Sequence, residues 1–166
     1  TSHPRNYRGI FTTRSGGNST SNFVIGMSAS DRKMYVYSGS FIIPQSSQSS
    51  GFDTEIWRHF CLTRDHTLSS NNTKFYIDGV LKYQLQNTYN FSDNKFNIGG
   101  DAVDSHRFYG KIRDLRVLVG TASTGAVPTS PLAPITNTKL LACSLPYIGD
   151  ANTEITPKIL TVGSGT

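Results

Sequence analysis

The sequence predicts an all-β fold, a two-sheet antiparallel jelly-roll sandwich. Apolar and polar residues alternate with a period of two along most of the chain, and Gly, Ser and Asn turn signals recur about every 8–12 residues. No segment carries the 3.6-residue apolar stripe of an amphipathic helix over three turns. The length of 166 residues suits one domain with a substantial core. We therefore expect many short strands and very little helix.

The predicted strands are the segments with this alternation, bounded by turn residues. They are residues 8–14, 22–29, 33–38, 55–64, 74–78, 80–86, 95–100, 107–120, 139–144 and 158–162. Residues 38–51 form a predicted polar loop that the apolar trio Phe41-Ile42-Ile43 interrupts. We expect residues 1–166 to be a single domain that belongs to a longer chain or assembly. Residues 121–137, which contain three prolines, are a predicted connection within it.

Two short motifs predict where strands end. Asp78-Gly79 suits a two-residue hairpin turn, because both positions of such a turn need positive φ. Within residues 107–120 the apolar alternation changes phase: Phe108 and Ile112 follow one phase, and Leu115, Val117 and Val119 follow the other. One uniform strand would expose one of these two sets to water. We therefore expect a bulge or a break near Arg113-Asp114.

Alternation also predicts which side chains fill the space between the sheets. The predicted core residues are Phe60, Leu62, Phe75, Ile77, Ile98 and Ile112, with Phe108 packed near them. The two cysteines, Cys61 and Cys143, match no metal-binding spacing and suit buried free thiols, although a disulfide between them stays open.

Charge and hydropathy favour neither nucleic acid nor a membrane as partner. The net charge is +5, but the basic residues are spread along the chain and interleaved with aspartates. Nucleic-acid binders usually gather such residues on one face or helix. No apolar run approaches the roughly 20 residues of a membrane-spanning helix. We expect a solvated surface with a mild attraction for acidic partners.

Four segments in order resemble the concanavalin A-like lectin/glucanase superfamily, and within it the laminin G-like and pentraxin-like branch. They are residues 57–64 (WRHFCLTR), 75–79 (FYIDG), 96–100 (FNIGG) and 108–117 (FYGKIRDLRV). Residues 115–122 (LRVLVGTA), 138–143 (TKLLAC) and 148–152 (IGDAN) are similar to laminin G-like modules of phage tail and virion-surface proteins. The resemblance implies a jelly-roll sandwich that binds or scaffolds, because such modules are grafted onto many proteins.

The function expected from this resemblance is that of a non-enzymatic virion module in a tail fibre, capsid fibre or decoration. It would contact host-surface glycan or neighbouring virion proteins, as a homo-oligomer or as part of a larger assembly on the virion surface. A secreted or cell-surface lectin or adhesin module, with an extracellular location, is the alternative. A degenerate glycoside hydrolase-like domain is a third reading.

The distribution of carboxylates favours a protein that is not an enzyme. Glucanases of the superfamily carry two Glu and an Asp at alternate positions of one strand, facing one cleft. This chain has two glutamates, Glu55 and Glu154, and neither lies in such a motif. His59, beside Trp57, suits packing better than general-base catalysis. We expect no catalytic residue.

Sugar binding requires an aromatic ring face together with polar groups for the hydroxyls. Tyr35 and Tyr37 share one face of a predicted strand, and the loop that follows Gly99 supplies the polar groups. The candidate carbohydrate-binding residues are Tyr35, Tyr37, Asp101, Asp104, His106 and Arg107. Asp101 and Asp104 are also the one close acidic pair that could seed a calcium site. We expect no cofactor and no metal, with two solvated turn aspartates as the favoured interpretation of this pair.

The resembling family carries one or two further strands before the segment that matches residues 8–14. Residues 1–7 (TSHPRNY) are polar and interrupted by proline, so they cannot supply an apolar strand. A sandwich without that strand would expose apolar core and an unpaired edge. We expect upstream residues, residues 156–162 or a neighbouring subunit to fill the gap, and the isolated chain to be oligomeric or poorly soluble.

Overall fold

A computed structural model of the chain describes residues 7–14, 19–48, 50–52, 55–93, 95–100 and 106–144. This part of the chain is built from strands and a single 3-10 turn, η1 (Gln45–Ser47). The strands are β1 (Tyr7–Thr12), β2 (Val24–Ser28), β3 (Met34–Ser38), β4 (Ser40–Ile43), β5 (Phe60–Arg64), β6 (Thr73–Ile77), β7 (Val80–Leu85), β8 (Asn97–Ile98), β9 (Leu115–Leu118) and β10 (Thr138–Ala142). The predicted strand at residues 158–162 lies outside the described residues.

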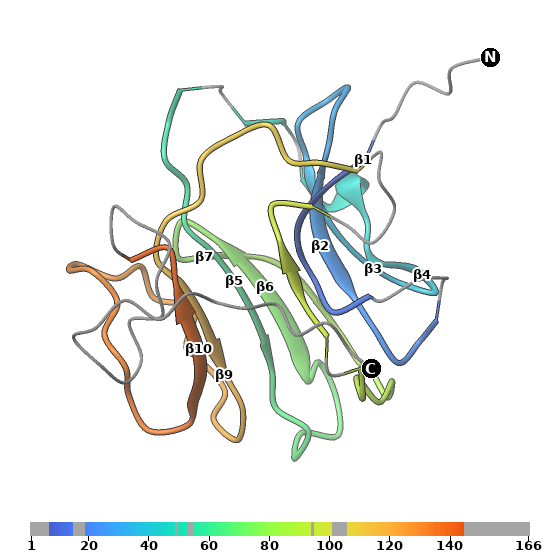
Figure 1. The fold of residues 1–166 in the computed structure, drawn as a ribbon. Helices are drawn as coiled ribbons and strands as arrows, with labels where there is room; N and C mark the ends of the chain where they lie inside the picture. The colour runs from blue at the N-terminus through green and yellow to red at the C-terminus, as the bar shows by residue number, and fades with distance from the viewer. Residues whose placement is uncertain are drawn as a thin grey trace, which may run out of the picture.

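The strands form two layers, and their ladders are antiparallel. One layer is a five-stranded sheet in the order β4-β3-β2-β1-β8, on the right of Figure 1. The other contains the three-stranded sheet β5-β6-β7 and, beside it, the pair β10-β9. The predicted all-β antiparallel sandwich is therefore confirmed.

The core lies between the layers. Its buried apolar side chains come from β1 to β4, from β6 and from β10, and they include Ile25, Val36, Phe75, Ile77 and Leu140. The prediction for Phe75 and Ile77 is confirmed, since both are buried.

Four of the predicted core residues are less buried than expected. They are Phe60, Leu62, Ile98 and Ile112, which are half-buried and pack against the core cluster. Phe108 also packs against this cluster, as predicted. Phe60 and Leu62 on β5 point toward the inner face, as the alternation predicts, because they pair with Ile77 and Phe75. Their burial is incomplete because one flank of the sandwich is open, as described below.

The Asp78-Gly79 hairpin turn has the predicted geometry. Asp78 has φ of 51° and Gly79 has φ of 77°, and Ile77 pairs directly with Val80 across the turn. The Asp78 carboxylate also binds the chain before β5: it accepts hydrogen bonds from the backbone N–H of His59, at 2.9 Å, and from Arg58 Nη1, at 2.7 Å. The turn thus anchors the entry to β5.

Replacing Asp78 by alanine should lower the free energy of unfolding by about 1–2 kcal/mol. The change removes the acceptor for the His59 N–H and the ion pair with Arg58. It also places alanine, which has no polar side chain to hydrogen-bond locally, in a left-handed backbone conformation. Asn in place of Asp78 is the matched control, because it keeps the side-chain acceptor and tolerates positive φ. Urea unfolding should show a clearly smaller loss for D78N than for D78A; equal losses would contradict this role of the turn.

The predicted break near Arg113-Asp114 is also present. Asp114 has φ of 54°, and β9 begins at the next residue. The predicted strand over residues 107–120 is consequently reduced to β9 and an isolated parallel bridge between Gly9 and Arg107. The apolar trio that was assigned to a loop instead belongs to β4, because Phe41 and Ile43 pair with β3. Residues 55–59, predicted as strand, lie outside β5.

Cys61 and Cys143 are both free thiols. Burial raises the pKa of each, and for Cys61 a hydrogen bond with Ser123 opposes that rise. Both therefore favour the protonated thiol, which is a poor nucleophile. Within the described residues, the structure contains no helix with the length and apolar character needed to span a membrane.

Candidate functional site

An aromatic cluster covers part of the five-stranded sheet on the face that points away from the core. It consists of Tyr7 on β1, Tyr35 and Tyr37 on β3, Phe41 on β4, and the ring of His106. Four ring pairs, Tyr7–Tyr35, Tyr7–Phe41, Tyr35–Phe41 and Tyr37–Phe41, have centroids 5.2–5.5 Å apart, and His106 lies 6.3 Å from Tyr7. These distances fall in the range of favourable aromatic pairs.

Strand register and two glycines explain why the rings meet. Tyr35 alternates with the core residue Val36, so its ring stands on the opposite face of β3. Gly26 is its cross-strand neighbour on β2, and Gly9 lies opposite Gly26 on β1. A Cβ on Gly26 would collide with the Tyr35 ring and would lie 2.6 Å from the carbonyl oxygen of Arg8. Gly26 therefore leaves the space in which the Tyr35 ring lies.

The rings differ in how much of their surface is open. Tyr35 is only 3% exposed, so it supports its neighbours and offers no ring face to a sugar. Phe41 is 41% exposed. Tyr37 is half-buried, and its hydroxyl donates a hydrogen bond to the carbonyl oxygen of Gly39, at 3.1 Å. Tyr7 and His106 are half-buried like Tyr37, so Phe41 is the most exposed ring of the cluster.

Two polar candidates lie at the border of the cluster. The Gly9 N–H donates to the carbonyl oxygen of His106, at 2.9 Å, and this bond holds His106 beside β1. Arg107, the next residue, is exposed. The structure therefore brings together three of the six predicted binding residues, Tyr35, Tyr37 and His106. Asp101 and Asp104, as binding residues and as the calcium candidates, lie outside the described residues. Elsewhere in the described chain no three His, Cys, Asp or Glu residues are grouped as metal ligands.

Two members of the cluster, Tyr7 and Phe41, were not among the predicted binding residues. Phe41 was placed in a loop, although it lies four residues after Tyr37 and starts an apolar trio. A tight β3–β4 hairpin, with Ser38 paired to Ser40, places it over Tyr37. The signal available in the sequence was a glycine between two β-rich segments, which is typical of a hairpin.

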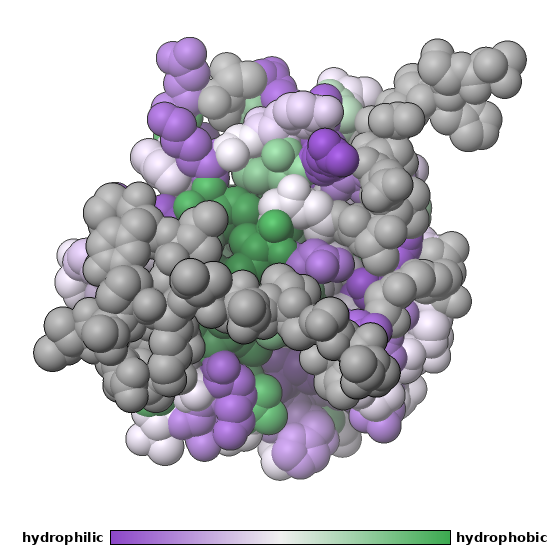
Figure 2. All heavy atoms as spheres, viewed as in Figure 1, coloured by the Kyte–Doolittle hydropathy of each residue, from purple (hydrophilic) through white to green (hydrophobic). Residues whose placement is uncertain are grey.

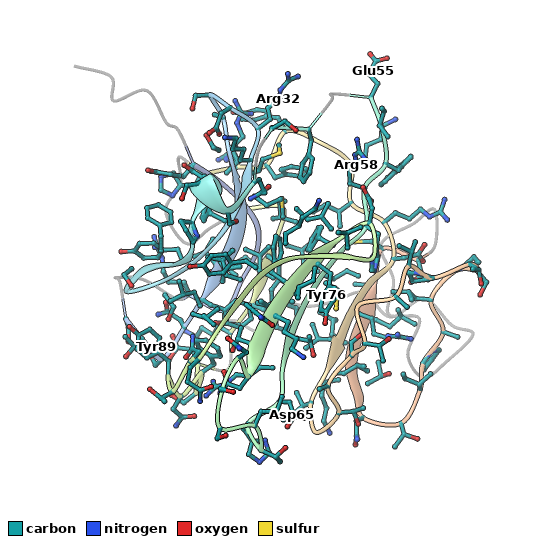
Figure 3. All side chains as sticks on the ribbon, turned by 180° about the vertical axis from the view of Figure 1, so that it is seen from behind. Arg32, Glu55, Arg58, Asp65, Tyr76 and Tyr89 are labelled. Atoms are coloured by element: carbon teal, nitrogen blue, oxygen red, sulfur yellow. The ribbon has the colours of Figure 1, made fainter. Side chains whose placement is uncertain are left out.

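The second candidate surface is a groove along the open flank between the layers, here named the interlayer groove. Its volume is about 1650 Å³, and it extends past Arg32 and Glu55 at one end of the molecule and Asp65 at the other (Figure 3). Apolar side chains of β5 and β9 line it, among them Phe60, Leu62 and Val117. Figure 2, which shows the face seen in Figure 1, has apolar side chains open between hydrophilic ones.

Several side chains at the margin of the interlayer groove are exposed although they are apolar. Trp57 is 58% exposed, and Ile56 and Tyr109 are also exposed. The Arg8 guanidinium lies 4.4 Å from the centre of the Tyr109 ring, in cation–π contact. His59, also at the groove, is half-buried; desolvation lowers its pKa, and the nearby Asp78 carboxylate acts in the opposite direction. The neutral imidazole is therefore the favoured form near neutral pH.

These features define a class of β-sandwich modules with an aromatic surface on one sheet. Residues 1–127 match a laminin G-type family model described as the concanavalin A-like lectin/glucanases superfamily, and the chain belongs to this family. The matched residues include strands β1 to β9 and the whole aromatic cluster. The chain matched none of the curated proteins and none of the solved structures with which it was compared.

Proposed function

We propose that this chain is a non-enzymatic adhesion module that binds glycan through the aromatic cluster. The observation that carries the proposal is the open surface of Phe41 and Tyr37, in a cluster that Tyr7 connects to His106, the residue before the exposed Arg107. Ring faces pack against the C–H side of a sugar, while guanidinium and imidazole groups bind its hydroxyls. Membership of a lectin-containing family supports this assignment.

The setting proposed for this activity is the surface of a virion, in a tail fibre, capsid fibre or decoration. The support is the likeness of residues 115–122, 138–143 and 148–152 to modules of phage tail and virion-surface proteins. In that setting the partners are host-surface glycans or neighbouring structural proteins. Coat or tail genes beside the gene for this chain would support a virion location, whereas a signal peptide on the parent sequence would favour a secreted lectin.

A glycan array tests the binding site. The full chain should bind a defined set of glycans, and Phe41→Ala should raise the Kd for them by about tenfold, which corresponds to the roughly 1.4 kcal/mol of one lost ring contact. Tyr37→Ala should act in the same direction. Both substitutions lie at positions with exposed surface, so folding should persist, and thermal unfolding should verify this.

Phe96→Ala is the matched control. Phe96 is 43% exposed, close to the value for Phe41, but it stacks on Phe11 beside the interlayer groove and lies outside the aromatic cluster. Its replacement should leave glycan affinity unchanged. Unaltered binding by the Phe41 and Tyr37 variants, or an equal loss in the Phe96 variant, would exclude the cluster as the glycan site.

A further inference from the structure

The interlayer groove runs between two strands whose outer edges are free in the described part of the chain. β5 pairs on one side with β6, and β9 pairs on one side with β10, but no ladder joins β5 to β9. Residues of both strands line the groove. The groove therefore offers unpaired strand edges to an incoming backbone.

The register of β5 and β6 determines which backbone groups of β5 face the groove. In an antiparallel ladder, hydrogen-bonded pairs alternate with pairs whose N–H and C=O groups point away from the partner strand. The Asp65 N–H donates to the carbonyl oxygen of Asn72, at 2.8 Å, and the register is unbroken, so the odd-numbered residues of β5 bond to β6. The backbone groups of Phe60, Leu62 and Arg64 therefore point to the free edge.

The apolar lining of the groove is only partly covered. Four half-buried side chains line it and pack against the hydrophobic core: Phe60, Leu62, Leu115 and Val117. The volume of about 1650 Å³ exceeds the roughly 300–1,000 Å³ of an ordinary ligand pocket. Because protein interiors are close-packed, an extended segment with apolar side chains on one face would complete this part of the core.

The lining also carries an excess of positive charge. It includes nine Arg or Lys residues and four Asp or Glu residues. Arg116 lies between Leu115 and Val117 on β9, so alternation turns its side chain to the outer face. A second copy of this chain carries the same basic groove and a net charge of +5, and would be repelled, whereas acidic side chains would be attracted.

We propose that the interlayer groove binds an extended segment of a partner protein in which apolar and acidic side chains alternate. The backbone of this segment pairs with the free edge of β5 as an added strand. Its apolar side chains cover Phe60 and Leu62, and its acidic side chains lie on the outer face, toward Arg116. In the free chain the groove stays open.

This surface is independent of the proposed glycan site. The aromatic cluster lies on the outward face of the five-stranded sheet, and none of its five rings lines the groove. Phe41→Ala should therefore weaken glycan binding and leave binding of the segment unchanged. The failure of one proposal is thus distinguishable from the failure of the other.

Two synthetic peptides of about eight residues, a length typical of strands, test the charge requirement. One alternates Val and Glu, and the other alternates Val and Lys, so both present the same apolar face. In fluorescence anisotropy, the full chain should bind the Glu peptide about tenfold more tightly than the Lys peptide. Arg116→Glu should remove most of this preference, and thermal unfolding should verify that the variant folds.

Lys82→Glu is the matched control for Arg116→Glu. It makes the same change in net charge, but Lys82 is an exposed residue of β7 that does not line the groove. Its replacement should leave the preference for the Glu peptide nearly unchanged. An equal effect of the two substitutions, or equal affinity of the full chain for the two peptides, would exclude an acidic occupant.

Amide exchange followed by NMR tests the strand pairing. In the free chain, the amides of Phe60, Leu62 and Arg64 should exchange faster than those of Cys61 and Thr63, which are bonded to β6. The Glu peptide at ten times its Kd should slow the exchange of the first three by about tenfold.

Three results of this experiment would overturn the proposal. Slow exchange of the edge amides in the free, dilute chain would show that the chain itself already covers the edge of β5. Exchange that slows with protein concentration alone would identify a second copy as the occupant. Peptide binding that leaves the edge amides unchanged, or that Phe41→Ala abolishes, would place the peptide elsewhere.

Discussion

Replacing Phe75 by alanine should lower the free energy of unfolding by about 3–5 kcal/mol, the range for large aromatic side chains removed from a core. Phe75 is 0% exposed and lies at the middle of β6. Its neighbours across the sheet are Leu62 on β5 and Tyr83 on β7, and both belong to the residues packed around the core. The flanking strands β5 and β7 restrict collapse of the cavity that Phe75→Ala leaves. The loss of unfolding free energy should therefore lie in the upper part of the range of about 3–5 kcal/mol.

Urea unfolding followed by circular dichroism measures this loss. Phe60→Ala is the informative comparison, because Phe60 lies on the neighbouring strand and points to the same interior but is only half-buried. It should cost clearly less than Phe75→Ala. A larger loss for Phe60 than for Phe75 would contradict the open flank and would indicate that the interlayer groove is filled around Phe60.

Replacing Gly26 by alanine should destabilise the protein by about 1–3 kcal/mol or more, because the added methyl group overpacks a closed site. It would meet the Tyr35 ring on one side and the Arg8 carbonyl oxygen, a backbone atom, on the other. The Tyr35 ring must then move, and Tyr7 and Phe41 with it. We therefore expect G26A to lower both the melting temperature and the glycan affinity.

Gly100→Ala is the control for Gly26→Ala. A Cβ at Gly100 would have no heavy atom within 4 Å, so G100A should be close to neutral in thermal unfolding. A double-mutant cycle with Tyr35→Ala identifies the cause: in that background G26A should cost less, because the ring that blocks the methyl group is gone. Strict additivity of the two changes would show that the cost of G26A does not arise from Tyr35.

Features governed by neighbours in the sequence were predictable. The Asp78-Gly79 turn and the break at Asp114 depend on backbone preferences of one or two residues and on a local change of alternation. The inner face of β6 follows from the same alternation. Features that depend on how strands distant in the sequence pack together could not be predicted from the sequence. The incomplete burial of Phe60 and Leu62 depends on the gap between β5 and β9, which no local pattern records.

The same distinction holds for the candidate site. Tyr35 and Tyr37 were predictable as one face of a strand, since they are two residues apart. The addition of Tyr7 depends on the pairing of β1 with β2 and of β2 with β3, and that of Phe41 depends on the β3–β4 hairpin. Alternation also could not distinguish the exposed Trp57 from a buried strand residue, because aromatic residues are common in both settings.

The claim that this module binds without catalysis is tested most directly by incubating the full chain with each glycan that it binds and assaying for new reducing ends. The account predicts that bound oligosaccharide is recovered intact after prolonged incubation, with binding that depends on Phe41 and Tyr37. Turnover of any polysaccharide that a single Asp→Asn substitution abolishes would contradict it.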